Sequence, residues 1–446
     1  MPLPIHDLST DAGRAGLAAT LARLRDTGSA AGDDAATVAD VLADVRRDGD
    51  AALVRYMQRW TDPAFAADRI RVTPEELDRA AEHLDTMPEL RDAIARAIDN
   101  VTAYQRHVLP EEKGTVVISG GELGMRWSPV KRVGLCVPGG TAVLFSTLVM
   151  LAVPALVAGV RPEDIHVMSP PPTRRGDEAA GDISPLVLGT AKLLGLSNVY
   201  RIGGAQGVAA LGFGTARVPQ VDLIAGPGNV YVQLAKAQLG AACGTDNGFY
   251  GPSEVVTVAD TSADPARVAA DLLAQAEHDP GKCFLVAWDR GVIDAVVAQI
   301  ETQMPQRRRR DAIAAALRDE SCAVLTADAD AAYDVANEFA SEHVNLAVAK
   351  PQAALEKLRH AGEVFLGDST PVAAGDYHAG PSHCLPTGTT ARFASGVSVY
   401  TFLKRTGTVA YPASGGGMSA RTIADVAAMA EAEGLDAHAA SVRARG

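Results

Sequence analysis

The sequence is poor in cysteine and in aromatic residues. Only five of its 446 residues are cysteine, an odd number, and no two of them form a Cys-x-x-Cys pair. This scattering excludes a disulfide framework and a zinc finger built on cysteine pairs. Aromatic residues make up 5% of the chain, while alanine and glycine are abundant, which favours a helix-rich α/β enzyme over a β-sandwich. The cysteines are Cys136, Cys243, Cys283, Cys322 and Cys384.

Positive charge is also in deficit. The 41 Lys and Arg residues are outnumbered by 54 Asp and Glu residues, and the formal net charge is −13. A chain this acidic repels nucleic acid and anionic membranes, so we expect neither as a partner. The first residues, MPLPIHDLSTDAGRAG, contain no basic segment followed by an apolar core. We therefore expect no secretory signal and a cytoplasmic protein.

One long segment lacks charge altogether. Residues 133–160, VGLCVPGGTAVLFSTLVMLAVPALVAGV, are long enough to cross a bilayer. However, Pro138, Gly139 and Gly140 divide the segment early, and Pro154 interrupts it again. This pattern favours a buried strand, a glycine-rich turn and a buried helix over a membrane span.

The rest of the chain alternates between two periodicities. Residues 1 to about 110 are typical of helices, for example TPEELDRAAEHL with Thr73 as N-cap and Glu76 at N3. After 115, β-branched runs alternate with Ala/Leu-rich runs, which predicts parallel βαβ units in at least two domains. The last fifty residues are expected to be mostly helical. The predicted strands are TVVIS, RVGLCV, DIHVMSP, VYRIGG, VDLIAGPG, EVVTVAD, CFLVAW, CAVLTAD, VNLAVA and EVFLG.

Two glycine-rich turns follow predicted strands and precede helices. They are GGAQG at 203–207 and GPGN at 226–229. A turn of this kind at a helix N-terminus can bind phosphate through backbone N–H groups. Neither fits the G-x-G-x-x-G dinucleotide pattern, since GPGNVY ends in Tyr231. Alone they are weak nucleotide signals, and tight turns of an α/β sheet explain them equally well.

Zinc-binding residue types gather in three places. GDYHAGPSHC contains Asp376, His378, His383 and Cys384 within ten residues. The helix expected over 264–278 ends in Gln275 and His278, which lie three residues apart and therefore share one face.

The third place is an adjacent acid and imidazole, Glu342 and His343, between a predicted helix and a strand. A neutral imidazole can accept a substrate proton. A helix C-terminal His and a solvated Glu-His pair are the structural alternatives.

Several segments together resemble the histidinol dehydrogenase family, in the family's order and from about residue 30 to 440. They are RVGLCVPGG, LFSTLVM, SPPPT, GGAQGVAAL, GPGNVYV, GPSEVVTVAD, QAEHDP, SEHVNL, GDYHAGPSHCLPTG, ARFASG and AEAEGLDAH. The resemblance implies a cytoplasmic, zinc-dependent, NAD-linked oxidoreductase of histidine biosynthesis. Such an enzyme oxidises L-histidinol to L-histidine through bound L-histidinal and reduces two NAD.

The resemblance also implies a fold and domain boundaries. We expect an α/β protein with two incomplete Rossmann-like domains with parallel sheets, small helical terminal domains, and an intertwined homodimer with shared active sites. The expected boundaries are an N-terminal segment at 1–31, a zinc and substrate domain from 32–135 and 252–397, an NAD domain at 136–251, and a C-terminal helical domain at 398–446 that reaches the partner subunit.

Site residues follow from the same resemblance. Its implied zinc ligands, one zinc per subunit, are Gln275, His278, Asp376 and His438; His378 and Cys384 have no implied role. Its implied catalytic residues are His343 as base and Glu342, which helps to activate water. The implied substrate contacts are the four zinc ligands with Ser253, His343, His383 and Glu433.

The implied NAD contacts are Cys136, Gln206 and Asn229. The family usually carries Tyr where this chain has Cys136, so an aromatic contact with the cofactor is missing, and we expect Cys136 to be a packing residue rather than a nucleophile.

Three other hypotheses stay open at this point. A paralogue of the same fold would keep zinc and NAD but oxidise another small polyol, such as a sulfonated diol. A catalytically silent scaffold is disfavoured by the complete ligand set and the Glu-His pair. A zinc hydrolase is disfavoured because the chain has no HExxH motif and no serine nucleophile elbow.

Overall fold

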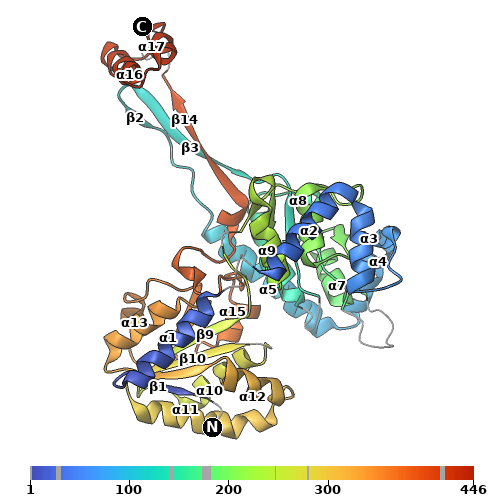
Figure 1. Ribbon diagram of the computed structural model, residues 1–446, viewed down its shortest axis with the longest axis vertical. Coiled ribbons are helices and arrows are strands. Elements are labelled where there is room, and N and C mark those ends of the chain that lie inside the picture. Colours follow the sequence, from blue (N-terminus) through green and yellow to red (C-terminus); the bar gives the residue numbers. More distant parts are fainter. Residues whose placement is uncertain are drawn as a thin grey trace.

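The computed structural model describes residues 3–26, 32–139, 144–172, 182–246, 248–278, 281–411 and 417–445. Two parallel sheets, each covered by helices on both faces, form the body of the molecule, and a long antiparallel arm projects from it (Figure 1). The chain is therefore an α/β protein with parallel sheets, as the alternating pattern predicted. All ten strands predicted from β-branched runs are present.

The first sheet has six parallel strands in the order β1-β11-β10-β9-β12-β13. Its central strands are buried on both faces, which explains their continuous apolar sequences. The strands are β1 (Ile5–Asp7), β9 (Glu254–Ala259), β10 (Lys282–Ala287), β11 (Cys322–Leu325), β12 (His343–Ala347) and β13 (Glu363–Leu366).

Helices cover both faces of this first sheet. One face packs against α1 (Asp11–Arg25) and α13 (Ala329–Phe339), and the other against α10 (Pro265–Ala276), α11 (Arg290–Gln303) and α12 (Arg310–Asp319). Phe284 of β10 stacks on Phe339 of α13, with ring centroids 4.3 Å apart. Two short helices, α14 (Pro351–Leu355) and α15 (Val372–Tyr377), precede and follow β13.

The second sheet has five parallel strands in the order β6-β5-β4-β7-β8. They are β4 (Val133–Cys136), β5 (Ile165–Met168), β6 (Asn198–Tyr200), β7 (Leu223–Ala225) and β8 (Gly244–Thr245). One face packs against α4 (Pro74–Asp85), α5 (Pro88–His107), α6 (Phe145–Val157) and α7 (Pro185–Leu193). The other packs against α2 (Asp33–Asp48), α3 (Asp50–Trp60), α8 (Gly204–Phe213) and α9 (Val230–Gln238).

This packing differs from the domain boundaries expected from the sequence. The helices between 33 and 107 pack on the five-stranded sheet rather than joining 252–397, and residues 5–25 supply β1 and α1 of the six-stranded sheet. The physical reason is that an amphipathic helix shows which face is apolar but not which sheet covers that face. The helix prediction itself is confirmed for α4, which begins with a capping box at Thr73 and Glu76.

The arm consists of three antiparallel strands in the order β14-β3-β2, and two helices lie at its tip (Figure 1). The strands are β2 (Val116–Ile118), β3 (Gly121–Pro129) and β14 (Leu403–Ala410), and the helices are α16 (Ala420–Ala432) and α17 (Asp436–Arg443). TVVIS is thus a strand, as predicted, but it lies in this arm and not in a βαβ unit. The expectation of a mostly helical C-terminus missed β14.

Short 3-10 helices complete the described fold. They lie at Ala67–Arg69, Pro162–Asp164, Gly240–Ala242, Met304–Gln306, Thr390–Arg392 and Val399–Phe402. The uncharged segment 133–160 forms β4 and α6, and α6 contains Pro154 within its 13 residues. Within the described ranges, no helix is both long and apolar enough to cross a membrane.

Candidate active site

A polar cluster lies at the amino ends of β9, β12 and β13. Ser253 precedes β9, Glu342 and His343 stand at the start of β12, and Glu363 begins β13 in register with His343. Because these strands are parallel neighbours, their first residues meet at one edge of the sheet. Ligand sites of open α/β sheets usually lie at the opposite, carboxyl edge. The chain connection explains the difference, since α10 returns to this edge and carries Gln275 in its last turn.

Glu342 is held at the centre of this cluster. Its Oε2 accepts hydrogen bonds from the Ser253 hydroxyl at 2.6 Å and from the Glu254 backbone N–H at 2.8 Å. Burial raises the pKa of the Glu342 carboxyl to about 8, although both hydrogen bonds lower it. The group can therefore hold or release a proton near neutral pH.

The His343 ring is oriented by the backbone. Its Nδ1 lies 3.2 Å from the carbonyl oxygen of Glu254, and because a carbonyl only accepts, Nδ1 donates. In the neutral ring Nε2 is then the free acceptor. That atom is buried without a hydrogen-bond partner and lies 3.9 Å from Asp376 Oδ1. In that neutral form His343 directs an acceptor nitrogen toward the same space as Asp376.

The expected zinc ligands of one chain approach this space from two helices. Gln275 lies in the last turn of α10 with its amide Nε2 buried and unpartnered, and His278 follows two residues after the helix ends at Ala276. The protein around His278 lowers its pKa, and the nearby Asp376 carboxylate opposes that effect. Within the described residues, no three His, Cys, Asp or Glu side chains form a complete metal-binding group.

His383 connects the cluster to the second sheet. Its Nδ1 donates to the Asp376 carbonyl at 2.8 Å, and its Nε2 accepts from the Thr147 hydroxyl of α6 at 3.1 Å. Burial lowers the pKa of the His383 ring, which keeps it neutral. Its neighbours in GDYHAGPSHC lie elsewhere: His378 contacts Asn100 of α5, and Cys384 is buried in an apolar core.

Two expected site residues are not in the cluster of this chain. Glu433 caps α16 and His438 lies in α17, both exposed at the tip of the arm (Figure 1). The arm holds them away from the two sheets that carry the other residues. A single chain therefore brings together Ser253, Gln275, His278, Glu342, His343, Asp376 and His383 but leaves these two apart.

A cavity of about 710 Å³ opens at the carboxyl ends of the second sheet's strands. It is lined by the turns after β4, β5, β6 and β7, including Cys136, Gln206 and Asn229. Gln206 Oε1 is buried without a partner, so an acceptor is available to a ligand. Leu144 also lines the cavity, and it immediately precedes α6, whose Thr147 contacts His383.

The GPGN turn brings backbone close to the cavity. Gly226 has φ +113°, and a Cβ there would lie 2.6 Å from the Cys136 carbonyl oxygen, so no other residue fits. Asn229 caps α9 by accepting the Val232 N–H at 3.2 Å. Burial raises the pKa of the Cys136 thiol to about 12. Cys136 is therefore an unreactive packing residue at the cavity wall.

Sequence reasoning missed two residues of the polar cluster. Thr147 lies within LFSTLVM but had no predicted role, and only its contact with His383 reveals one. Glu363 begins the predicted strand EVFLG, and burial raises its pKa to about 7. No local signal identified it, because β13 is a half-buried edge strand, where an acidic first residue is ordinary.

The two parallel sheets, the cavity at one and the acid-imidazole cluster at the other define the class of the protein, an α/β enzyme. A family model described as histidinol dehydrogenase matches residues 25–446. The chain belongs to the histidinol dehydrogenase family, which confirms the resemblance drawn from its motifs.

Relatives and a solved structure agree with this assignment. The histidinol dehydrogenase of Synechococcus sp. is 44% identical over 411 residues, 92% of each chain. That of Rhodospirillum rubrum is 41% identical over 447 residues, covering 100% of this chain and 99% of its own. The crystal structure of histidinol dehydrogenase from Elizabethkingia anophelis superposes with a TM-score of 0.86 at 32% identity, covering 100% of this chain and 98% of the other.

Proposed function

We propose that this protein oxidises L-histidinol to L-histidine in two steps, through bound L-histidinal, with the reduction of two NAD. The observation that supports this most directly is His343, whose Nδ1 donates to a backbone carbonyl, so that in the neutral ring Nε2 is an acceptor, buried and unpartnered. A hydride can leave the alcohol carbon only as the hydroxyl loses its proton, and in this proposal Nε2 accepts that proton.

Glu342 acts in the second oxidation. Water must add to the aldehyde carbon before a second hydride can leave, and that water must lose a proton. With a pKa of about 8, the Glu342 carboxyl exchanges protons near neutral pH. Ser253 and the Glu254 N–H hold its Oε2 in place, which leaves the rest of the carboxyl for the water.

The donor set fits a zinc ion. Gln275, His278 and Asp376 of one chain, together with His438 of a second copy, would hold it, because amide, imidazole and carboxylate are all ligands of zinc. Gln275, which is 3% exposed, would coordinate through its amide oxygen, because the amide nitrogen has no lone pair to offer a metal. When bound, zinc supplies a positive centre that takes the substrate's amine and imidazole and orients the alcohol carbon.

We further propose an intertwined homodimer. The arm carries Glu433 and His438 away from its own sheets (Figure 1), so these residues can serve only the site of another copy. The arm also exposes apolar side chains that a partner would cover, namely Val116, Val117, Ile118 and Val409. In this proposal Glu433 contacts the substrate and residues 398–446 form the domain that reaches the partner.

The two sheets would then bind different ligands. We propose that both belong to incomplete Rossmann-like domains, the six-stranded one for zinc and substrate and the five-stranded one for NAD. Cys136, Gln206 and Asn229 would contact NAD in the cavity at the second sheet. The five cysteines are buried and unpaired, which fits a reducing compartment, and the cytoplasm is our proposed location.

Turnover stoichiometry tests the proposed reaction. We expect two NADH per L-histidinol, with turnover abolished by a chelator and restored by zinc. His343→Asn should lower kcat by roughly 10²- to 10⁴-fold. Near-normal kcat in His343→Asn would refute the role of the base. Turnover of a sulfonated diol with no turnover of histidinol would instead assign the protein to a paralogous reaction.

Mixing two inactive variants tests the shared site. His343→Asn damages the core of a site, and His438→Ala damages the arm of its partner. In a random mixture of the two chains, half of the dimers are hybrids. Each hybrid has one intact site, because one subunit supplies an intact core and the other an intact arm, so roughly a quarter of wild-type activity should return. A fully active monomer, or no recovery on mixing, would contradict the swapped arrangement.

A further inference from the structure

The cofactor cavity has one uncommitted cation on its wall. Among the described residues that line it, Arg59 alone is charged, and no Asp or Glu is present. A dinucleotide carries two negative charges on its pyrophosphate. In open α/β folds, moreover, an acidic residue commonly marks the ribose of NAD, whereas an arginine accommodates a 2′-phosphate. The cavity thus presents a neutral surface with a single positive group, and this inference depends on the dinucleotide of the proposed function.

Within the part of the chain that the structure describes, no carboxylate pairs with Arg59, whereas two nearby arginines each pair with one. Arg55, one turn earlier in α3, lies 2.6 Å from Asp48, and Arg69 lies 2.5 Å from Asp62. The only described contact of the Arg59 guanidinium is the ring face of Trp60, 5.6 Å from its carbon to the centroid. Stacking on an aromatic ring orients a guanidinium but leaves its N–H groups available.

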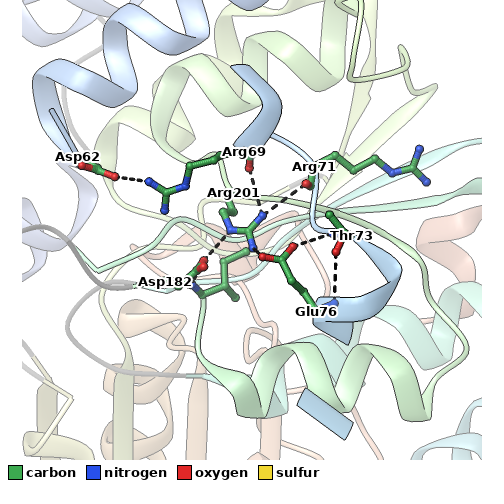
Figure 2. A network of polar contacts seen from close by, with 8 residues as sticks. Asp62, Arg69, Arg71, Thr73, Glu76, Asp182 and Arg201 are labelled. Carbon is green, nitrogen blue, oxygen red and sulfur yellow. Dashed lines mark hydrogen bonds and ion pairs between the residues drawn. The ribbon is translucent and has the colours of Figure 1, made fainter. Parts of the chain in front are cut away.

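The chain beyond α3 is fixed to the second sheet by a polar network around the buried Arg201 (Figure 2). Arg201, which follows β6 and is 2% exposed, contacts the carboxylates of Asp182 and Glu76 and donates to the carbonyls of Arg69 and Arg71.

The α3 end of this segment is tied in as well. The Gln58 amide donates to the Phe65 carbonyl at 2.8 Å, and Arg69 donates to Asp62, two residues beyond Trp60. The end of α3 is thereby held at the cavity, whose wall also includes Gly203 and Gly204.

We propose that Arg59 is the phosphate-binding residue of the cofactor cavity. Its guanidinium pairs with a phosphate of the bound dinucleotide, either the pyrophosphate common to NAD and NADP or the 2′-phosphate of NADP. The amino ends of α8 and α9 line the same cavity and present backbone N–H groups to the same anion. A planar guanidinium suits a phosphate because two N–H groups can donate in parallel.

Direct binding tests this proposal without substrate or turnover. Isothermal titration calorimetry measures the binding of NADH, NADPH and adenosine to the purified wild-type protein and to the Arg59→Gln variant. If Arg59 binds the pyrophosphate, Arg59→Gln should weaken NADH and NADPH alike by about tenfold. If it binds the 2′-phosphate, only NADPH should weaken, and in both cases adenosine affinity should stay unchanged.

Two further variants sharpen the comparison. Arg59→Lys keeps the charge and should recover most of the lost affinity. Arg55→Gln is the matched control, because Arg55 lies on the same helix but does not line the cavity, and its affinities should stay within about twofold of wild type. The salt dependence of NADH binding should become shallower in Arg59→Gln, since one cation fewer meets the phosphate.

Other results would overturn the proposal. If Arg59→Gln bound both dinucleotides with wild-type affinity, Arg59 would have no role in phosphate binding. If the variant lost as much affinity for adenosine as for the dinucleotides, the substitution would merely have distorted the cavity wall. The proposed function fails separately: a protein that binds dinucleotides through Arg59 but does not oxidise histidinol refutes the reaction alone. A protein that oxidises histidinol, and whose Arg59→Gln variant binds dinucleotides with unchanged affinity, refutes the phosphate contact alone.

Discussion

The buried pair of Lys236 and Asp246 beneath the GPGN turn gives the sharpest stability prediction. The Lys236 ammonium contacts the Asp246 carboxylate, donates to the Gly226 carbonyl at 3.0 Å, and lies 5.0 Å from the centroid of the Tyr250 ring. The other oxygen of Asp246 accepts the Gly226 N–H at 2.7 Å. Both side chains are almost fully buried, at 5% and 6% exposure.

We expect Lys236→Met to lower the free energy of unfolding by about 3–5 kcal/mol at pH 7.5, because it leaves Asp246 buried without a countercharge. Burial already raises the pKa of Asp246, and Lys236 is the main group that opposes this. In the variant the carboxyl takes up a proton more readily on folding. The loss should therefore be smaller at pH 5, where the folded carboxyl is more easily protonated, and larger as pH rises.

Urea unfolding followed by circular dichroism measures this effect. Lys236→Met with Asp246→Asn should recover most of the stability, since no buried charge is left and an amide oxygen can still accept the Gly226 N–H. Lys192→Met is the matched control: Lys192 pairs with Asp78 at the surface and should be dispensable. A loss below about 1 kcal/mol in Lys236→Met, or no recovery in the double variant, would refute the electrostatic reasoning.

Three further predictions use the same unfolding assay. Burial raises the pKa of Glu342 to about 8, so the folded protein keeps a proton that the unfolded chain loses above about pH 4.5. The stability of the wild-type protein should therefore fall between pH 5 and pH 8, and it should fall less steeply in Glu342→Gln, which has no carboxyl at this position. Parallel stability profiles for the two proteins would contradict this. Gly13→Ala should lower the free energy of unfolding by about 1–3 kcal/mol, because the added Cβ would lie 1.9 Å from the Asp7 carbonyl oxygen. An unchanged urea midpoint would show that the end of β1 can shift without loss of stability. Phe284→Ala should cost about 3–5 kcal/mol by removing the buried partner of Phe339, and a loss near 1 kcal/mol would mean that the core closes over the space.

Most of the elements of the fold could be predicted from local sequence. Runs such as EVVTVAD and CFLVAW are buried on both faces, so their composition alone marks them as central strands. Pro138 likewise showed that the segment 133–160 is no continuous span, and α6 begins at Phe145; Pro154, by contrast, lies inside α6 and does not interrupt it as predicted. Local sequence did not predict which sheet each helix packs against. The helices α2 to α5 have clear apolar stripes, but a stripe does not identify the sheet that it covers.

The candidate site divides in the same way. Glu342 and His343 are adjacent, and Gln275 and His278 share a helix end, so spacing alone grouped them. Nothing local in the sequence links Thr147 to His383 or places Glu363 beside His343, because each pair is joined only by neighbouring elements that the fold brings together. GDYHAGPSHC shows the limit most clearly: four zinc-capable residues lie within ten positions, yet His378 and Cys384 point to other surroundings.

Local sequence was sufficient to predict the α/β alternation, the family and the residue types of the site. These depend on hydrophobic period, turn chemistry and motif order, which are properties of the chain within a few residues. The three-dimensional fold was needed to place the cluster at the amino edge of one sheet and the cavity at the carboxyl edge of the other, and to show that the arm carries Glu433 and His438 away from both (Figure 1). Such placements follow from contacts between segments far apart in sequence, where the free energy of burial depends on all partners at once.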